Sequence, residues 1–195
     1  MAMVSSSEIS NLTTSIPLPI KPKKIVIIGA GGIVNDAHLP AYKKAGFEVL
    51  GIFDPQRDKA EKCAKEFNIE KIYSSEEEAF LEKEVVFDIA VPPQVLIEVV
   101  KKIPEGSICQ LQKPMGNSMK DAQSIRQIIK EKKIIACVNL QLKFSPMMIA
   151  LREAIDKDMI GQITELEISL SVKTPWHLWP FLETLDNVEV PLHSI

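Results

Sequence analysis

A glycine-rich turn is the first stretch of the sequence whose residue types and spacing suggest chemistry. Gly29, Gly31 and Gly32 stand between the apolar run KIVIIG and a segment with helical periodicity. The first glycine suits a tight turn, and the second lets a pyrophosphate approach the backbone and the following helix N-terminus. Glycine turns without a ligand also occur, and the third position of the fingerprint is Val34 rather than Gly or Ala. We expect Gly29, Gly31, Gly32 and Ile33 to bind a dinucleotide cofactor.

An acidic residue follows at the position where such a cofactor needs one. The run FEVLGIFD ends in Asp54, 25 residues after Gly29. Its carboxylate would accept hydrogen bonds from the adenosine ribose hydroxyls and repel a 2′-phosphate, which favours NAD over NADP. Arg57 could still pair with a 2′-phosphate, so NADP is not excluded. The alternative interpretation is that Asp54 only caps a helix beginning at Pro55.

Two further runs end in residues that could contact the same ligand. Pro92 follows VFDIAV, and Lys113 follows the apolar run SICQLQ. In an open α/β sheet the carboxyl ends of the strands face the ligand crevice, so both residues would share an edge with Gly29 and Asp54. The pair Pro92-Pro93 is expected to prevent both a continued strand and an immediate helix. A lysine after a strand is, taken alone, usually a solvated charge.

The elements that must position these residues alternate along the chain. The runs KIVIIG, FEVLGIFD, VVFDIAVPP, SICQLQKP and IIACVNLQ predict buried parallel strands, and the segments between them have helical periodicity. Ser75 with Glu78, and Ser118 with Asp121, have the spacing of capping boxes that open helices. The predicted fold class is α/β, a Rossmann doubly wound parallel sheet followed by the start of a second α/β or α+β domain.

The chain divides into three predicted parts. We expect a flexible leader over residues 1–22, an NAD(P)-binding Rossmann domain over 23–139, and over 140–195 the incomplete start of a C-terminal substrate and oligomerisation domain, so that the chain would be truncated. In this last part, Ser145 and Pro146 have the pattern of a helix start, and QITELEISLSV alternates as a half-buried antiparallel strand would.

Composition narrows the classes of function. The net charge is -3 with no basic stripe, which argues against a nucleic-acid partner. The N-terminus lacks the pattern of a secretory signal, and no stretch of about 18 apolar residues predicts a membrane span. The three cysteines, Cys63, Cys109 and Cys137, lack metal-ligand spacing and are interpreted as buried free thiols in a reducing compartment. We expect a cytoplasmic protein without a metal site.

Several motifs occur in the order found in one enzyme family. GAGGIVNDAHLPAY, FD at Asp54, AVPP, QKP, NLQLKFSP and DMIGQI resemble the Gfo/Idh/MocA oxidoreductases from about Lys23 to the end of the chain. The resemblance implies a Rossmann domain followed by a domain built on a large open sheet, and NAD(P)-dependent oxidation or reduction of sugar and polyol carbons. It also implies a full-length parent that forms homo-oligomers.

The resemblance assigns a catalytic role to Lys113, which would hydrogen-bond the reacting hydroxyl and the nicotinamide ribose and assist proton transfer. Gln112 stands where the family usually has Glu, and the proline after the lysine is often cis. Asn139 and Gln141 occupy positions where family members direct polar side chains toward nicotinamide and substrate. A turn asparagine and a solvated glutamine are the alternative interpretation.

The last segment holds two more substrate candidates. Trp176 offers an aromatic face that suits the C–H surface of a sugar, although tryptophans more often anchor packing. Family members carry an Asp-x-x-x-His constellation on the second domain, and His193 stands where that segment is expected to begin. A purely structural role of His193 is the alternative interpretation. The leading prediction is an NAD(P)-dependent oxidoreductase acting on a sugar or polyol, with inactivity of this short chain left open. The alternative is a non-catalytic dinucleotide-binding fragment or regulator on the same fold.

Overall fold

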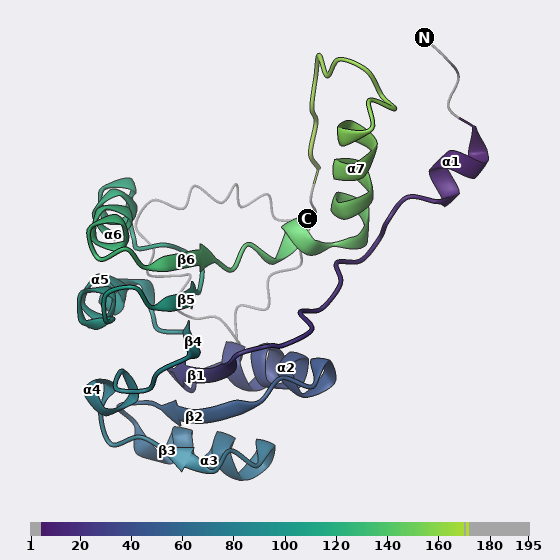
Figure 1. Cartoon of the computed structure of the whole chain (residues 1–195). Coiled ribbons are helices and arrows are strands. Elements are labelled where there is room, and N and C mark those ends of the chain that lie inside the picture. Colours follow the sequence, from purple (N-terminus) through teal and green to yellow (C-terminus); the bar gives the residue numbers. More distant parts are fainter. Residues whose placement is uncertain (1–4, 170, 172–195) are drawn as a thin grey trace, which may run out of the picture.

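The protein, described here from a computed structural model over residues 5–169 and residue 171, is built around one six-stranded sheet (Figure 1). All neighbouring strands run parallel, in the order β3-β2-β1-β4-β5-β6. The strands are β1 (Lys24–Ile28), β2 (Val49–Phe53), β3 (Lys71–Ile72), β4 (Val85–Ile89), β5 (Ile108–Leu111) and β6 (Ile135–Val138). This is the order of a Rossmann sheet, so the predicted fold class is confirmed.

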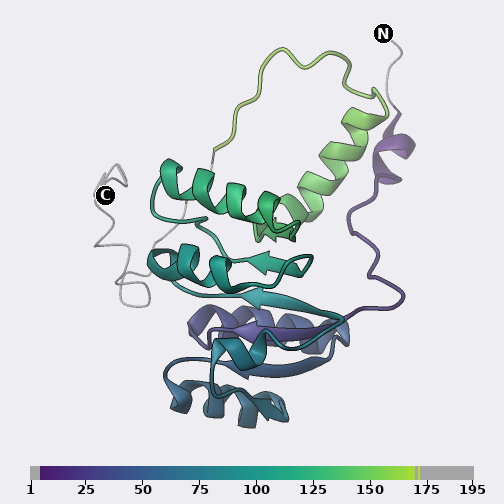
Figure 2. The same cartoon turned by 60° about the vertical axis from the view of Figure 1, so that its left-hand side comes forward.

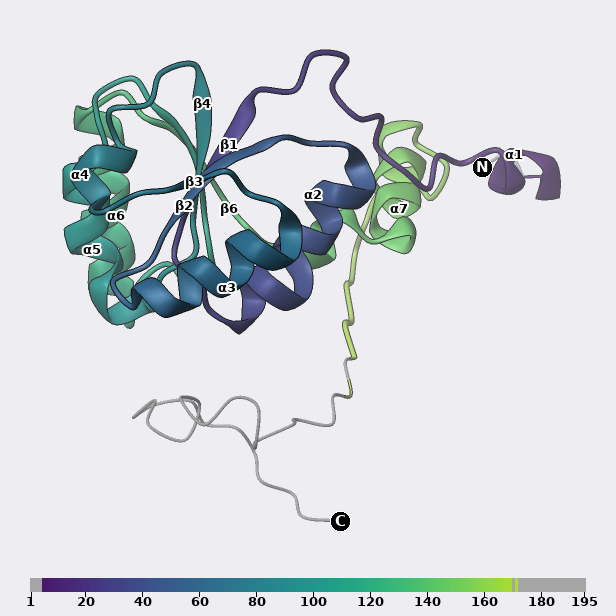
Figure 3. The same cartoon turned by 90° about the horizontal axis from the view of Figure 1, so that it is seen from below.

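Helices cover both faces of the sheet (Figure 3). On one face lie α2 (Leu39–Ala45), preceded by the π-helical turn η1 (Val34–His38), and α3 (Arg57–Phe67). On the other lie α4 (Glu76–Ala79), α5 (Pro93–Lys102) and α6 (Met119–Glu131). The central strand β1 is buried on both sides, with Ile25 and Ile27 in one apolar cluster and Val26 and Ile28 in the other. A continuous apolar run is what such a strand requires.

The predicted helix starts at Ser75 and Ser118 are confirmed, with a different second contact. Each serine hydroxyl accepts a hydrogen bond from the backbone N–H three residues on, at 3.1 Å in both cases. The acid three residues after each serine does not accept from the serine's own backbone N–H, as a capping box requires. Its carboxylate accepts instead from the backbone N–H of the residue before the serine. Two backbone donors at each helix start are still satisfied.

One strand was missed from the sequence, and one local prediction is wrong. The two-residue strand β3 has no hydrophobic run long enough to predict it from the sequence. It forms because it pairs with β2. Helix α5 begins at Pro93, directly after Pro92, whereas the proline pair was expected to prevent an immediate helix. The first helical position needs no N–H donor and suits the fixed φ of proline, so Pro93 starts the helix instead of blocking it.

Beyond β6 the chain leaves the sheet. It passes through the short 3-10 helix η2 (Gln141–Phe144) into α7 (Pro146–Asp156), which lies outside both helical layers (Figures 1 and 2). Ser145 caps α7 as predicted, by accepting from the N–H of Met148 at 3.4 Å. No strand forms over residues 162–169, where the alternating pattern predicted one, because a strand needs a neighbour to pair with and none of the described strands lies beside this segment.

The predicted leader has local structure of its own. Ser5 opens the single-turn helix α1 (Ser6–Ser10) with a complete capping box to Glu8. None of the residues of α1 is buried, and the backbone N–H of Thr13 donates to the carboxylate of Glu153 on α7. The N-terminal segment therefore contacts the chain far from it in sequence, at α7.

The three cysteines differ in exposure. Cys63 and Cys109 are buried as predicted, but Cys137 is exposed. It lies on the edge strand β6 beside Ile135, which is 66% exposed, on a side that no described helix covers. An apolar run on an edge strand is buried on one side only, which the sequence pattern did not reveal. Within the described residues, no helix is long and apolar enough to span a membrane.

Candidate functional site

The predicted cofactor-binding residues, together with Asn139, gather at one edge of the sheet because they stand on five loops that leave the carboxyl ends of β1, β2, β4, β5 and β6. Four of these loops are held by a backbone hydrogen bond to the last residue of an adjacent strand. These bonds are Gly29 N–H to Phe53 at 2.7 Å, Ala90 N–H to Ile28 at 2.8 Å, Gln112 N–H to Ile89 at 2.9 Å and Asn139 N–H to Leu111 at 2.8 Å. The strand order reverses between β1 and β4, and open α/β sheets bind ligands outside the carboxyl ends at such a point.

Gly29 and Gly31 are glycines for two different reasons. Gly29 has φ +108°, and a Cβ there would lie 2.4 Å from the carbonyl oxygen of Ala90, so the turn and the packing against β4 both require glycine. Gly31 has no such constraint, since a Cβ would meet no atom within 4 Å. The open space over Gly31 fits a ligand that approaches the backbone, as the pyrophosphate of a dinucleotide does.

Asp54 joins the glycine turn to the loop after β2. One carboxylate oxygen accepts from the N–H of Ala30 at 2.7 Å, and the other accepts from the N–H of Gln56 at 2.8 Å. The helix after it begins at Arg57 rather than Pro55, with Gln56 as its cap, so Asp54 is not the N-cap residue. A carboxylate has about four acceptor positions. Two of them therefore remain open to donors of a ligand.

A hollow of about 310 Å³ opens beside the glycine turn. Its lining includes Gly31, Gly32, Asp36, Lys59 and Lys62. Sequence reasoning missed the two lysines, which belong to α3 and are spaced three residues apart, so both fall on one side of that helix. Their ammonium groups supply positive charge near the expected position of the cofactor phosphates.

Pro92 lies next to this turn. It is exposed and precedes α5, two residues after Ala90, whose carbonyl limits the size of residue 29. Ile33 is also exposed, at 42%, immediately before the π-helical turn η1. Both side chains therefore stand at the edge where sequence reasoning expects the cofactor.

Lys113 lies two residues after β5 and is exposed. Its peptide bond to Pro114 is cis, as the family resemblance implied. The side-chain oxygen of Gln112 accepts from the backbone N–H of Lys113 at 3.1 Å, so the glutamine supports the lysine backbone. Among the described residues, no hydrogen bond or ion pair engages the ammonium, which leaves it available to a ligand.

The structure describes two of the substrate candidates, Asn139 and Gln141, and they differ in position and exposure. Asn139 follows β6 directly and is half-buried, whereas Gln141 opens η2 and is exposed. The structure therefore places Asn139 at the candidate site through its strand, and Gln141 in the segment that leads away. Trp176 and His193 lie outside the described residues.

A buried polar cluster below this edge was not predicted. His38 is 6% exposed, and its Nδ1 lies 2.7 Å from Oδ2 of Asp88, which is 0% exposed. The Tyr42 hydroxyl donates to the same oxygen at 2.8 Å. Burial, followed by the nearby charge of Asp88, raises the pKa of Tyr42 well above its ordinary value. The isolated aspartate inside the apolar run VVFDI was the available signal, because a buried carboxylate needs donors.

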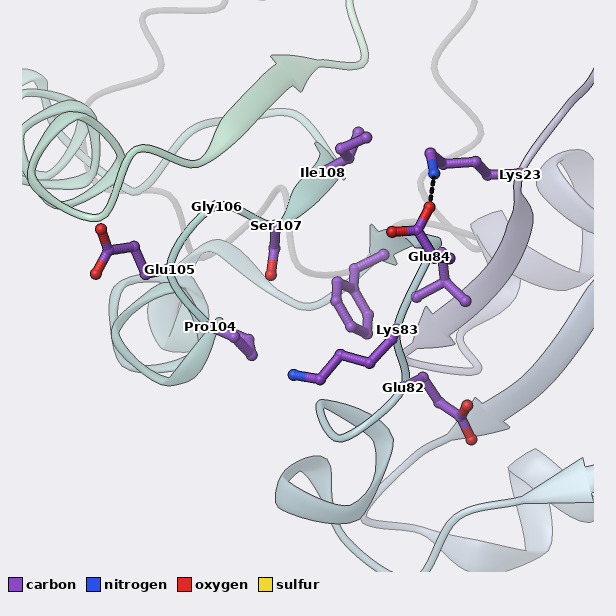
Figure 4. Close-up of a pocket in the computed structure, with 11 residues that line it drawn as sticks. Lys23, Glu82, Lys83, Glu84, Pro104, Glu105, Gly106, Ser107 and Ile108 are labelled. Carbon is purple, nitrogen blue, oxygen red and sulfur yellow. Dashed lines mark hydrogen bonds and ion pairs between the residues drawn. The ribbon is translucent and has the colours of Figure 1, made fainter.

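A second hollow, of about 190 Å³, lies at the opposite edge, between the amino ends of β4 and β5 (Figure 4). The Glu84 carboxylate forms an ion pair there with Lys23 at 2.5 Å, and the Glu82 carboxylate accepts hydrogen bonds from Lys71 and Tyr73. Two carboxylates of this hollow thus have partners within the chain. It also lies away from the carboxyl ends, where ligands of open α/β sheets bind.

Comparison with known proteins agrees with the geometry. Residues 23–140 match the Gfo/Idh/MocA model, described as an oxidoreductase family with an NAD-binding Rossmann fold. The chain belongs to this family. The match covers the sheet and all five site loops, and it ends just after Asn139. Membership in the Gfo/Idh/MocA family therefore rests on the part of the chain that carries the candidate site.

Individual known proteins match a similar part of the chain. The trans-1,2-dihydrobenzene-1,2-diol dehydrogenase of Mus musculus is 27% identical over 141 residues, which are 70% of this chain and 42% of the mouse protein. An NAD-binding oxidoreductase from Klebsiella pneumoniae has a TM-score of 0.65 at 22% identity, covering 72% of this chain and 40% of that one. The UDP-N-acetylglucosamine 3-dehydrogenase GnnA of Acidithiobacillus ferrooxidans has a TM-score of 0.61 at 20% identity, covering 69% and 42%. The matches span about two fifths of these proteins.

Proposed function

We propose that this chain supplies the dinucleotide-binding half of an NAD-dependent oxidoreductase that transfers a hydride between nicotinamide and a sugar or polyol carbon. The observation that carries the proposal is the pairing of Gly31 with Asp54. The first leaves open space over the backbone, and the second lies one hydrogen bond from the same turn with acceptor positions to spare. Family membership supports the same function.

Each part of a dinucleotide has a proposed partner. The glycine turn and Ile33 would hold the pyrophosphate, Asp54 the adenosine ribose, and Pro92 would line the path toward the nicotinamide. Arg57 donates a hydrogen bond to Glu61 at 2.8 Å, so it is already engaged, which supports NAD rather than NADP as the cofactor. Lys59 and Lys62 in the hollow could nevertheless attract the 2′-phosphate of NADP. The choice between the two cofactors is therefore open to a direct test.

Lys113 is the proposed catalytic residue. The bound nicotinamide would supply the hydride acceptor or donor. The ammonium of Lys113, at the end of β5, would hydrogen-bond the reacting hydroxyl and assist transfer of its proton. Asn139 would contact the ligand from the neighbouring strand end. The diol named for the mouse relative supports a substrate with a hydroxyl-bearing carbon. Contacts of Gln141, Trp176 and His193 with substrate, and homo-oligomerisation of a full-length parent, remain predictions.

Titration of the full chain with NADH and NADPH, followed by nicotinamide fluorescence, tests cofactor binding. We expect NADH to bind more tightly than NADPH. The variant Asp54→Asn should weaken NADH binding by about tenfold or more, because hydrogen bonds to a charged group contribute about 1.5–3 kcal/mol. The matched control is Asp58→Asn, an exposed acid in the first turn of α3, which should bind like the wild type. Failure to bind either cofactor at millimolar concentration would refute the proposal, and tighter NADPH binding would reverse the cofactor assignment.

Turnover separates the enzyme from the alternative, a non-catalytic dinucleotide-binding module. The full chain is incubated with NAD and a panel of sugars and polyols, and NADH formation is measured. Turnover that disappears in Lys113→Ala but persists in Lys120→Ala, an exposed lysine of α6, supports the enzyme. NADH binding without turnover across the panel would instead support the binding module for this chain.

A further inference from the structure

The buried cluster reaches the candidate site through one side chain. Asp88, in β4, accepts from three side chains: His38 at 2.7 Å, Tyr42 at 2.8 Å and Gln110 at 3.4 Å. On the far side of the imidazole, Nε2 of His38 lies 3.3 Å from Nδ2 of Asn139. A continuous path of polar contacts therefore connects a fully buried carboxylate to the carboxyl edge of the sheet.

Hydrogen-bond polarity fixes the direction of this path. An ionised carboxylate can only accept, so Nδ1 of His38 must carry the proton that faces Asp88. The Nδ2 amide group of Asn139 can only donate, so Nε2 of His38 must be unprotonated where the two meet. His38 is then the neutral imidazole with its proton on Nδ1. Because Nδ2 of Asn139 is engaged by the histidine, the free acceptor of the amide is Oδ1.

Asn139 lies at the candidate site, where an oriented amide oxygen could accept a hydrogen bond from a ligand. Asn139 is half-buried, directly follows β6, and its backbone N–H donates to Leu111, two residues before Lys113. The loops carrying Lys113 and Asn139 thus leave adjacent strand ends. A lysine ammonium can only donate. An oriented amide oxygen on the neighbouring loop would add a hydrogen-bond acceptor to the same edge.

We propose that Asp88, acting through His38, is a positioning residue that holds Oδ1 of Asn139 as a hydrogen-bond acceptor at the ligand-binding edge. The donor that it receives is the carboxamide N–H group of the bound nicotinamide. The ligand part of this inference rests on the proposed function. The orientation of the amide does not, because every contact that sets it lies within the chain.

The first test is nitrogen-15 NMR of His38 in the full, ligand-free chain at neutral pH. Coupling between the ring nitrogens and carbons shows which nitrogen carries the proton. We expect a neutral ring protonated on Nδ1, and slowed hydrogen exchange of the Asn139 side-chain amide. A proton on Nε2, in either the other tautomer or the cation, would overturn the proposal, since Asn139 would then have to turn Oδ1 toward the histidine. This result needs no variant and no cofactor.

The second test measures NADH affinity in a double-mutant cycle. Asn139→Ala should weaken binding by about 2- to 12-fold, the effect of one neutral hydrogen bond. Asp88→Asn should weaken binding by a similar factor and leave His38 in mixed tautomers, whereas Tyr42→Phe, which removes a different donor to Asp88, should keep the Nδ1 tautomer. The double variant Asp88→Asn with Asn139→Ala should lose no more than Asn139→Ala alone.

The outcomes of the cycle separate the two proposals. Losses that multiply in the double variant would show that Asp88 acts independently of Asn139 and would overturn the positioning role. If Asp88→Asn fails to fold, the wild-type tautomer still decides whether the amide is oriented as proposed. If the wild type does not bind NADH, the proposed function fails, and the tautomer and amide exchange still test the orientation by themselves.

Discussion

Replacing Gly29 by alanine should mainly reduce the stability of the fold, whereas replacing Gly31 by alanine should mainly weaken NADH binding. In Gly29→Ala the new Cβ would lie 2.4 Å from the Ala90 carbonyl oxygen, on a backbone with φ +108°. Such a backbone costs a non-glycine residue about 1–3 kcal/mol, and forcing the β4 end aside costs about 1–3 kcal/mol more. We expect the free energy of unfolding to fall by about 2–6 kcal/mol, a large part of the 5–15 kcal/mol typical of a domain.

Gly31→Ala is the matched control for stability and the probe for binding. A Cβ at Gly31 meets no atom within 4 Å, and its φ is not positive, so the free energy of unfolding should change by no more than about 1 kcal/mol. The same methyl group would occupy the space proposed for the pyrophosphate. NADH binding should therefore weaken by about tenfold or more, or about 1.4 kcal/mol.

Urea unfolding of the full chain, followed by circular dichroism, measures the first effect, and fluorescence titration with NADH measures the second. A Gly29→Ala variant as stable as the wild type would refute the close approach of the Gly29 turn to the end of β4. A Gly31→Ala variant that is strongly destabilised but keeps its NADH affinity would show that Gly31 serves packing rather than ligand access.

Two other predictions concern groups outside the candidate site. Burial raises the pKa of the Cys109 thiol to about 12, whereas Cys137 is exposed. Mass spectrometry after brief iodoacetamide treatment should therefore find Cys137 alkylated and Cys109 unmodified. Equal alkylation rates of the two thiols in the native chain would contradict the structure. Hydrogen bonds from Lys157 and then Thr13 lower the pKa of Glu153 to about 2, so the stability that this carboxylate adds is present above about pH 4.5 and lost as pH falls toward about 2. The difference in unfolding midpoint between wild type and Glu153→Gln should shrink over that interval, and a difference that grows on acidification would show the sign to be wrong.

Most of the sheet could be predicted because its strands are continuous apolar runs between helical segments. In β1, alternate residues enter two different cores, so Ile25 to Ile28 are all apolar and easily recognised. The two-residue β3 has no such pattern and depends on its pairing with β2. The strand predicted within 162–172 does not form over 162–169, because alternation describes a face but does not supply a partner.

The candidate site was predictable where a residue type carries its own constraint. Gly29 is required by backbone geometry, and Asp54 follows a strand at a recognisable distance from it. The contact between His38 and Asp88 could not be predicted, because it joins residues 50 positions apart through the packing of η1 on β4. The exposed edge position of Cys137 likewise depends on strand order, which sequence periodicity does not reveal.

Mapping of NADH binding by backbone amide chemical shifts in the full chain tests the central claim most directly. We expect the largest changes at the carboxyl edge of the sheet, at Ala30, Gly31 and the loops after β2, β4 and β5. The hollow at the opposite edge, around Gly106 and Ser107, should stay unchanged. Changes centred on that hollow, or no changes at millimolar NADH, would contradict the assignment of this edge as a dinucleotide site.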